Sequence, residues 1–116
     1  MMPTLYVSTR KGLFTITRHQ RGMWSIEDAA FLGDSVSLML PDRRDGARYV
    51  AFGLGHFGVK LRRSRDHGET WDELAAPAFP PMPEGTESKL SDGRPWPWRV
   101  DQIWSLEAGH EPNQLW

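Results

Sequence analysis

The feature that most constrains the fold of this chain is an internal repeat of 43 to 47 residues. The pair Tyr6-Val7 recurs as Tyr49-Val50, 43 positions later, and Trp24 recurs as Trp71, 47 positions later. A repeat of this length is typical of a unit built from one four-stranded antiparallel sheet. The chain is therefore expected to consist of repeated sheets.

Short β-rich runs, bounded by turn signals such as Asp45-Gly46 and Asp66-His67-Gly68, fill the repeats. The expected strands cover 4–9, 13–18, 23–27, 36–40, 48–52, 59–64, 70–74 and 102–107. No segment has the period of a helix. The sequence therefore predicts an all-β fold of the β-propeller type, with blades of four antiparallel strands.

The repeat and the expected strands predict that residues 1–116 form the N-terminal part of one propeller. Strands B to D of a first blade lie in 4–27, a complete second blade in 36–74, a long Pro-rich loop in 75–99, and the start of a third blade in 101–116. Such a piece leaves strand edges unpaired. Its expected partners are therefore the remaining blades of a longer chain, or further copies associating through the exposed edges.

Composition excludes several classes of function. Lys and Arg number 14 against 15 Asp and Glu, so there is no concentrated basic surface for nucleic acid or an anionic membrane. There is no Cys, which removes thiolate metal sites and cysteine nucleophiles. No signal peptide or apolar span is visible, and a cytoplasmic location is predicted by default.

Neither a cofactor nor a metal is predicted. The run from Gly53 to Gly58 fits G-x-G-x-x-G, but a strand pattern follows it where a nucleotide site requires a helix. The four His are not at metal-ligand spacing.

The most specific motif is the segment Ser64-Arg65-Asp66-His67-Gly68-Glu69-Thr70-Trp71, which matches Ser-x-Asp-x-Gly-x-Thr-Trp at all five specified positions. In a hairpin, Asp66 can accept N–H bonds across the turn and Gly68 can adopt a positive φ. Thr70 can begin the next strand and Trp71 can cover the hairpin base. A structural role is predicted for these residues. A second copy, in 17–24, has His19 in place of the Asp.

This motif resembles the Asp-box, or bacterial neuraminidase repeat, and most of the chain resembles bacterial sialidase-like propeller proteins. In such families, which include sialidases, xyloglucan hydrolases and sortilin-type receptors, the motif is structural, so the resemblance implies a fold more than a function. Sialidases carry an Arg on strand A and an Asp in the B-to-C loop. Here those positions read Val36-Ser37-Leu38-Met39-Leu40 and Gly53-Leu54-Gly55-His56-Phe57-Gly58, without either residue.

Propeller topology places the B-to-C and D-to-A loops on one face, where a ligand is expected. The ligand-face candidates are Arg10, Lys11, His56, Trp96, Trp98 and Arg99, and the candidate catalytic groups are His56 and Asp101. The alternatives are a solvated turn for Arg10 and Lys11, a structural hydrogen bond for His56, and loop packing for the two Trp.

Two functions are open at this stage. The first is a non-catalytic binding or scaffold propeller for a carbohydrate or protein ligand. The second is a glycoside hydrolase that acts on a carbohydrate at the ligand face, for which paired carboxylates are required.

Overall fold

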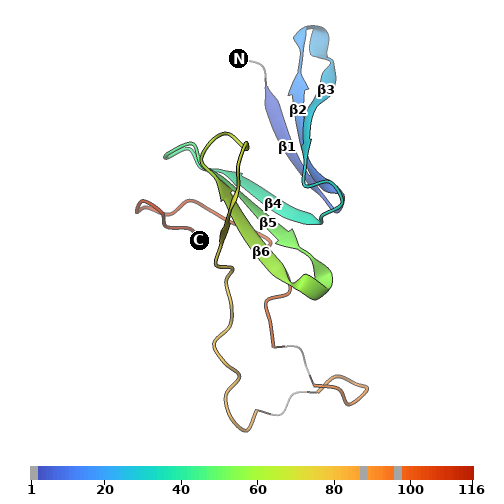
Figure 1. Cartoon of the computed structure of the whole chain (residues 1–116), viewed down its shortest axis with the longest axis vertical. Coiled ribbons are helices and arrows are strands. Elements are labelled where there is room, and N and C mark those ends of the chain that lie inside the picture. Colours follow the sequence, from blue (N-terminus) through green and yellow to red (C-terminus); the bar gives the residue numbers. More distant parts are fainter. Residues whose placement is uncertain (1–2, 87–88, 96–97) are drawn as a thin grey trace.

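The computed structural model describes residues 3–86, 89–95 and 98–116, and it contains two antiparallel β-sheets (Figure 1). The described residues contain no α-helix, only two short 3₁₀ turns, η1 (Gln20–Gly22) and η2 (Gly55–Phe57). The prediction of an all-β chain with antiparallel sheets is therefore confirmed. None of the helical segments described is long and apolar enough to cross a membrane.

Sheet A consists of three strands in chain order, β1 (Thr4–Thr9), β2 (Gly12–Arg18) and β3 (Trp24–Ala30). A tight turn joins β1 to β2 and ends at Gly12, whose φ is 138°. A Cβ there would lie 2.8 Å from the carbonyl oxygen of Ala30. Gly12 therefore lets the hairpin close directly against the end of β3.

Sheet B is a four-stranded meander of β4 (Val36–Pro41), β5 (Arg48–Gly53), β6 (Val59–Ser64) and β7 (Asp72–Leu74). Its inner strand β5 contains the most buried of the described residues, Val50 and Ala51, both 0% exposed. Adjacent residues of a strand point to opposite faces, so both faces of sheet B are covered.

One face of sheet B packs against sheet A. Val50 and Phe52 of β5 and Val36 of β4 form a cluster with Leu13 of β2, and Tyr6 of β1 packs against it. Figure 1 shows β1 and β2 beside sheet B, with sheet A above it. Burial of these apolar side chains is the main contact that joins the two sheets.

The opposite face of sheet B is covered by the C-terminal segment. Ala51 and Leu61 form a second cluster with Ile103, and Leu106 packs against it. The Gly109 N–H donates to the Gln114 carbonyl oxygen at 2.8 Å, which repeats the bond from the Asp42 N–H to Ala47, at 2.7 Å, in the β4–β5 turn. The two bonds span the same number of residues, so Gly109 is the equivalent of Asp42. Ile103 precedes Gly109 by six residues, as Val36 precedes Asp42, and Ile103 is therefore the equivalent of Val36.

The two clusters thus repeat one packing arrangement. Leu13 and Leu61, each 5% exposed, occupy equivalent positions on β2 and β6, opposite Ser8 and Ala51 respectively. Val36 lies against the first Leu and Ile103 against the second. In each sheet, therefore, the next segment of the chain packs on the face that carries the equivalent Leu.

The predicted strand 102–107 is wrong, because the structure has no strand there. Only its end is paired: Glu107 and Trp116 exchange two backbone hydrogen bonds, and Ala108 forms an isolated antiparallel bridge with Leu115. The preceding residues have no neighbouring strand among the described residues, so they lack the ladder that would define a strand.

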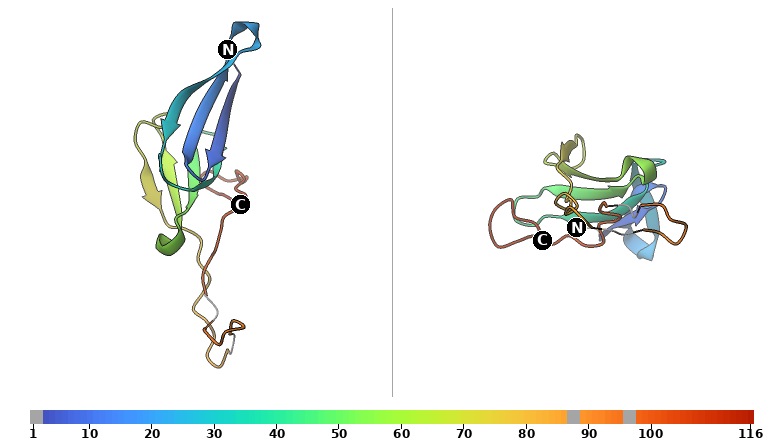
Figure 2. Two further views of the ribbon diagram at one scale, coloured as in Figure 1. Left: turned by 90° about the vertical axis from the view of Figure 1, so that its right-hand side faces the viewer. Right: turned by 90° about the horizontal axis from the view of Figure 1, so that it is seen from below.

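The described residues of 75–99 contain no strand or helix and extend away from both sheets (Figure 2). It contributes to the elongated shape of the molecule, whose principal extents are 61, 35 and 22 Å. The chain returns from this loop to sheet B at Ile103.

Candidate functional site

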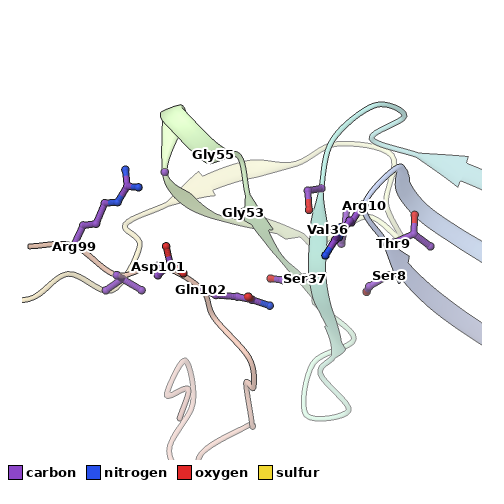
Figure 3. A pocket seen from close by; sticks show the side chains of 13 residues that line it. Ser8, Thr9, Arg10, Val36, Ser37, Gly53, Gly55, Arg99, Asp101 and Gln102 are labelled. Carbon is purple, nitrogen blue, oxygen red and sulfur yellow. The ribbon is translucent and has the colours of Figure 1, made fainter. Parts of the chain in front are cut away.

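A polar cavity of about 500 Å³ lies at one end of the two sheets (Figure 3). It is lined by the β1–β2 turn, the start of β4, the β5–β6 loop and the residues after the long loop. Figure 3 shows Arg99 and Asp101 on one side and Arg10 with Ser8 and Thr9 on the other. Loops distant in sequence thus meet around one concave surface.

The cavity carries more positive than negative charge. Arg10 and Arg99 contribute two guanidinium groups, and Asp101 is the only carboxylate among the described residues that line it. No ion pair involving either Arg occurs in the described part of the chain. Guanidinium groups bind carboxylates and phosphates in bidentate geometry, so the cavity suits an anionic oxygen ligand.

Hydroxyl and amide groups complete the lining. Ser8, Thr9, Ser35, Ser37 and Gln102 belong to it. Two of the hydroxyls are engaged in the fold: Thr9 donates to the Gly12 carbonyl at 2.8 Å and Ser37 to that of Ala51 at 3.2 Å. Sequence analysis missed these five residues, because short polar side chains at strand ends are common and carry no motif.

The structure brings together three of the residues that the sequence singled out, Arg10, Arg99 and Asp101. Three others do not line this cavity. Lys11 is exposed on the β1–β2 turn, and His56 is exposed on η2, where its ring contacts Phe57 edge to face at 5.9 Å. Trp98 donates its indole N–H to the Pro80 carbonyl at 2.7 Å, inside the loop. Trp96 lies outside the described residues.

A smaller cavity of about 300 Å³ adjoins the first and shares Arg10, Ser35, Gly53 and Gly55 with it. It adds a second carboxylate, Asp34, and the exposed ring of Phe57. Together the two cavities form a continuous concave surface at this end of the sheets, with an aromatic side chain among its lining residues.

At the opposite end, the turn from Ser64 to Trp71 is closed by hydrogen bonds to Asp66. Its carboxylate accepts bonds from the backbone N–H of Thr70 at 2.8 Å, from the Thr70 hydroxyl, and from the Ser64 hydroxyl at 2.8 Å. Gly68 has a φ of 90°. The predicted hydrogen bond across the turn and the predicted positive φ are both confirmed.

Trp71 closes the base of this turn. Its indole N–H donates to the Gly68 carbonyl at 3.2 Å, and its ring packs edge to face against Phe31 at 5.1 Å. Strand β7 begins only at Asp72, two residues later than expected, because the Thr70 N–H is bonded to Asp66 rather than to β6. The bonds from Thr70 and Ser64 lower the pKa of Asp66 to about 2.

The neighbouring β4–β5 turn contains an ion pair between a buried carboxylate and an exposed Arg that the sequence did not reveal. Asp42 is 3% exposed, and its Oδ2 lies 2.8 Å from Nη2 of Arg44, whose guanidinium lowers the pKa of the carboxyl. Nη1 of the same Arg donates to the carbonyls of Gly109 and Glu111 at 2.9 and 2.6 Å. This pair therefore links two turns that are far apart in sequence.

The described residues contain no group of three or more His, Asp or Glu side chains arranged to hold a metal ion. The candidate site consists of guanidinium, hydroxyl and carboxylate groups.

Comparison of the chain with protein-family models, with curated proteins and with solved structures found no match.

Proposed function

We propose that the chain forms part of an Asp-box β-propeller of the sialidase-like type, whose role is non-catalytic binding of a carbohydrate that carries a carboxylate. The ligand occupies the cavity between Arg10 and Arg99. The observation that carries this proposal is that two Arg and several hydroxyl residues, from four separate segments, line one concave surface.

The repeated packing supports the propeller part of the proposal. Sheets A and B stack through Leu13 and Val36, and the next segment stacks on sheet B through the equivalent Leu61 and Ile103. Successive stacking of like sheets on the same face is how propeller blades are arranged. The hydrogen bonds of the Ser64–Trp71 turn support the motif on which the resemblance depends.

A binding role is favoured over hydrolysis because glycoside hydrolysis uses two carboxylates about 5–9.5 Å apart across the scissile bond. Among the described residues, Asp101 is the only carboxylate that lines the main cavity, and Asp34 lines the adjoining cavity alone, so neither cavity holds a pair of carboxylates. The glycoside hydrolase remains the alternative that an assay decides.

The proposal is tested by calorimetric titration of the chain with N-acetylneuraminic acid, glucuronic acid and glucose. The acidic sugars are expected to bind and glucose to bind at least tenfold more weakly, since a charge-assisted hydrogen bond contributes about 1.5–3 kcal/mol. Arg10→Ala and Arg99→Ala should each raise Kd about tenfold or more. Arg43→Ala, which removes an exposed Arg from the β4–β5 turn, is the matched control.

Equal affinity for acidic and neutral sugars, or Arg variants that bind like the control, would refute the anionic ligand. Release of reducing sugar from a glycoside by the wild type, abolished by Asp101→Asn, would replace the binding role with the hydrolase.

A further inference from the structure

The carboxylate of Asp34 has no partner in the fold. It lines the smaller cavity together with Arg10, the residue through which this cavity adjoins the main one. The residue is half-buried, and among the described residues no group donates a hydrogen bond to its carboxylate and no cation pairs with it. A charge that is partly removed from water is normally paired, so a cationic group of a ligand is the expected partner of Asp34.

The backbone on either side of Asp34 is fixed. Before it, the Gly33 N–H donates to the Lys11 carbonyl oxygen at 3.0 Å, in the β1–β2 turn of sheet A. After it, the Ser35 carbonyl oxygen accepts from the Gly53 N–H of sheet B at 3.1 Å. The segment that carries the carboxylate is therefore tied to both sheets, and a ligand that binds there does not have to order it.

An exposed aromatic ring lines the same cavity. Phe57 is 77% exposed, and its N–H donates to the Leu54 carbonyl oxygen at 3.1 Å. The Leu54 N–H in turn donates to the Gly58 carbonyl oxygen at 2.9 Å, which closes the β5–β6 loop beneath the ring. Ammonium groups bind over aromatic faces and form charge-assisted hydrogen bonds with carboxylates. Asp34 and Phe57 together therefore have the chemistry of an ammonium site.

The charges of the two cavities balance when both are considered. Arg10 and Arg99 are positive, Asp34 and Asp101 are negative, and no other charged side chain occurs among the described residues that line them. None of the four forms an ion pair with another described residue. A ligand with a carboxylate alone would leave an excess of negative charge. A ligand with a carboxylate and an ammonium group matches both halves of the surface.

We propose that the ligand of this site carries an ammonium group as well as a carboxylate, and that Asp34 and Phe57 bind the ammonium group. The inference rests on the proposed function, because it takes the carboxylate to lie between Arg10 and Arg99. The two cavities share lining residues, so one ligand reaches both. A sugar acid with a free amine has both charges on one small ring and is the class of ligand that fits.

Calorimetric titration with matched ligands tests the inference. Glucosaminuronic acid is glucuronic acid in which an amine replaces one hydroxyl group. At about pH 6, below the ordinary pKa of an amine, this group is protonated. The wild type is then expected to bind glucosaminuronic acid at least tenfold more tightly than glucuronic acid. Glucosamine, which has the amine without the carboxylate, is expected to bind more tightly than glucose.

Two variants assign the effect to residues. Asp34→Asn removes the charge and keeps the shape, and it should reduce the advantage of glucosaminuronic acid to less than about twofold. Phe57→Leu keeps an apolar side chain without the aromatic face, and it should reduce the advantage about threefold. The matched controls are Asp72→Asn, at an exposed residue of β7, and Phe79→Leu, at a 57% exposed Phe of the long loop. Both controls should keep the full advantage.

The outcomes separate this inference from the proposed function. Equal affinity for the two acids, or an Asp34→Asn variant that keeps the advantage, overturns the inference and leaves the carboxylate site in place. If neither acid binds, the proposed function fails and the neutral pair decides. A preference for glucosamine over glucose that Asp34→Asn removes then supports the ammonium site, whereas equal affinities overturn it.

Discussion

Sheets A and B have equivalent strands but very different surroundings. Val7 and Val50 hold the same place in their strands, yet one is 38% exposed and the other is fully buried. Among the described residues, sheet B is covered on both faces, by sheet A and by the Ile103 segment, whereas sheet A is covered on one. Burial in this fold is therefore a property of the stack and not of the residue.

The two turns that close the sheets differ in the same instructive way. In the Ser64–Trp71 turn the positive φ values are at His67 and Gly68, whereas in the 17–24 turn they are at Arg21 and Gly22, one position nearer to the Trp. His19, which replaces the Asp, bonds instead to Ser25 and Glu27 of β3. The 17–24 turn thus has a hydrogen-bond pattern of its own. It is not a weakened copy of the Ser64–Trp71 turn.

The largest expected effect tests whether the two stacking contacts are equal. Leu13→Ala and Leu61→Ala should each lower the free energy of unfolding by about 2–5 kcal/mol, by similar amounts, because each removes a buried side chain from an equivalent cluster. Chemical denaturation measures both. Leu32→Ala, at an exposed position, should change stability by less than about 0.5 kcal/mol.

A Leu61→Ala variant as stable as the Leu32→Ala control would break the equivalence. It would mean that the Ile103 segment does not cover sheet B in solution.

A smaller effect is expected at the valine pair. Val50→Ala should cost about 2 kcal/mol, from about 0.8 kcal/mol for each buried methylene and a cavity term. Val7→Ala should cost less than about 0.5 kcal/mol in a dilute sample. Chemical denaturation of both variants measures the difference.

The smallest effect concerns the pH dependence of stability. It distinguishes the Ser64–Trp71 turn, which contains Asp66, from the 17–24 turn, which has His19 in that place. The folded pKa of Asp66, about 2, lies below its ordinary value of 3.8. The ionised group therefore stabilises the fold above pH 4, and this contribution is lost as the pH falls from about 4 towards 2. Asp66→Asn should be less stable than the wild type at neutral pH, and the two stabilities should converge near pH 2.

The comparison must be made as a difference between variants, because the pKa of Asp42 and that of Glu27 are also lowered in the fold. Asp72→Asn, at an exposed residue of β7, is the control. A stability gap between wild type and Asp66→Asn that stays constant from pH 7 to pH 2 would contradict the assignment.

The sequence predicted the strands well where turn chemistry and alternation agreed. The expected strands at 4–9 and 59–64 coincide with β1 and β6. The prediction failed at 102–107, where the side-chain pattern is that of a strand but the neighbouring strand is missing. Alternation reports which face a residue takes, whereas a strand also requires a partner for its backbone.

The candidate site was predictable only in part. Arg10 and Asp101 could be assigned to one end of the sheets from topology, and the cavity contains both. Trp98 could not be judged from sequence, because its indole bonds to Pro80, a contact made inside a loop without regular structure. The ion pair of Arg44 with the buried Asp42 was also unpredictable, since the other acceptors of Arg44 are the carbonyls of residues 109 and 111.

The C-terminal segment, to which Arg44 is linked, is expected to open before the core of the fold. Strands β4 to β7 pair with their sequence neighbours, so their contacts close short loops, whereas the docking of Ile103 has to close the loop that begins after Leu74. The segment belongs to no sheet and its end is held by an isolated bridge, so it is expected to open locally at a lower free energy than the core strands. Native-state hydrogen exchange should therefore begin at the Glu107 and Trp116 amides, before the amides of β5.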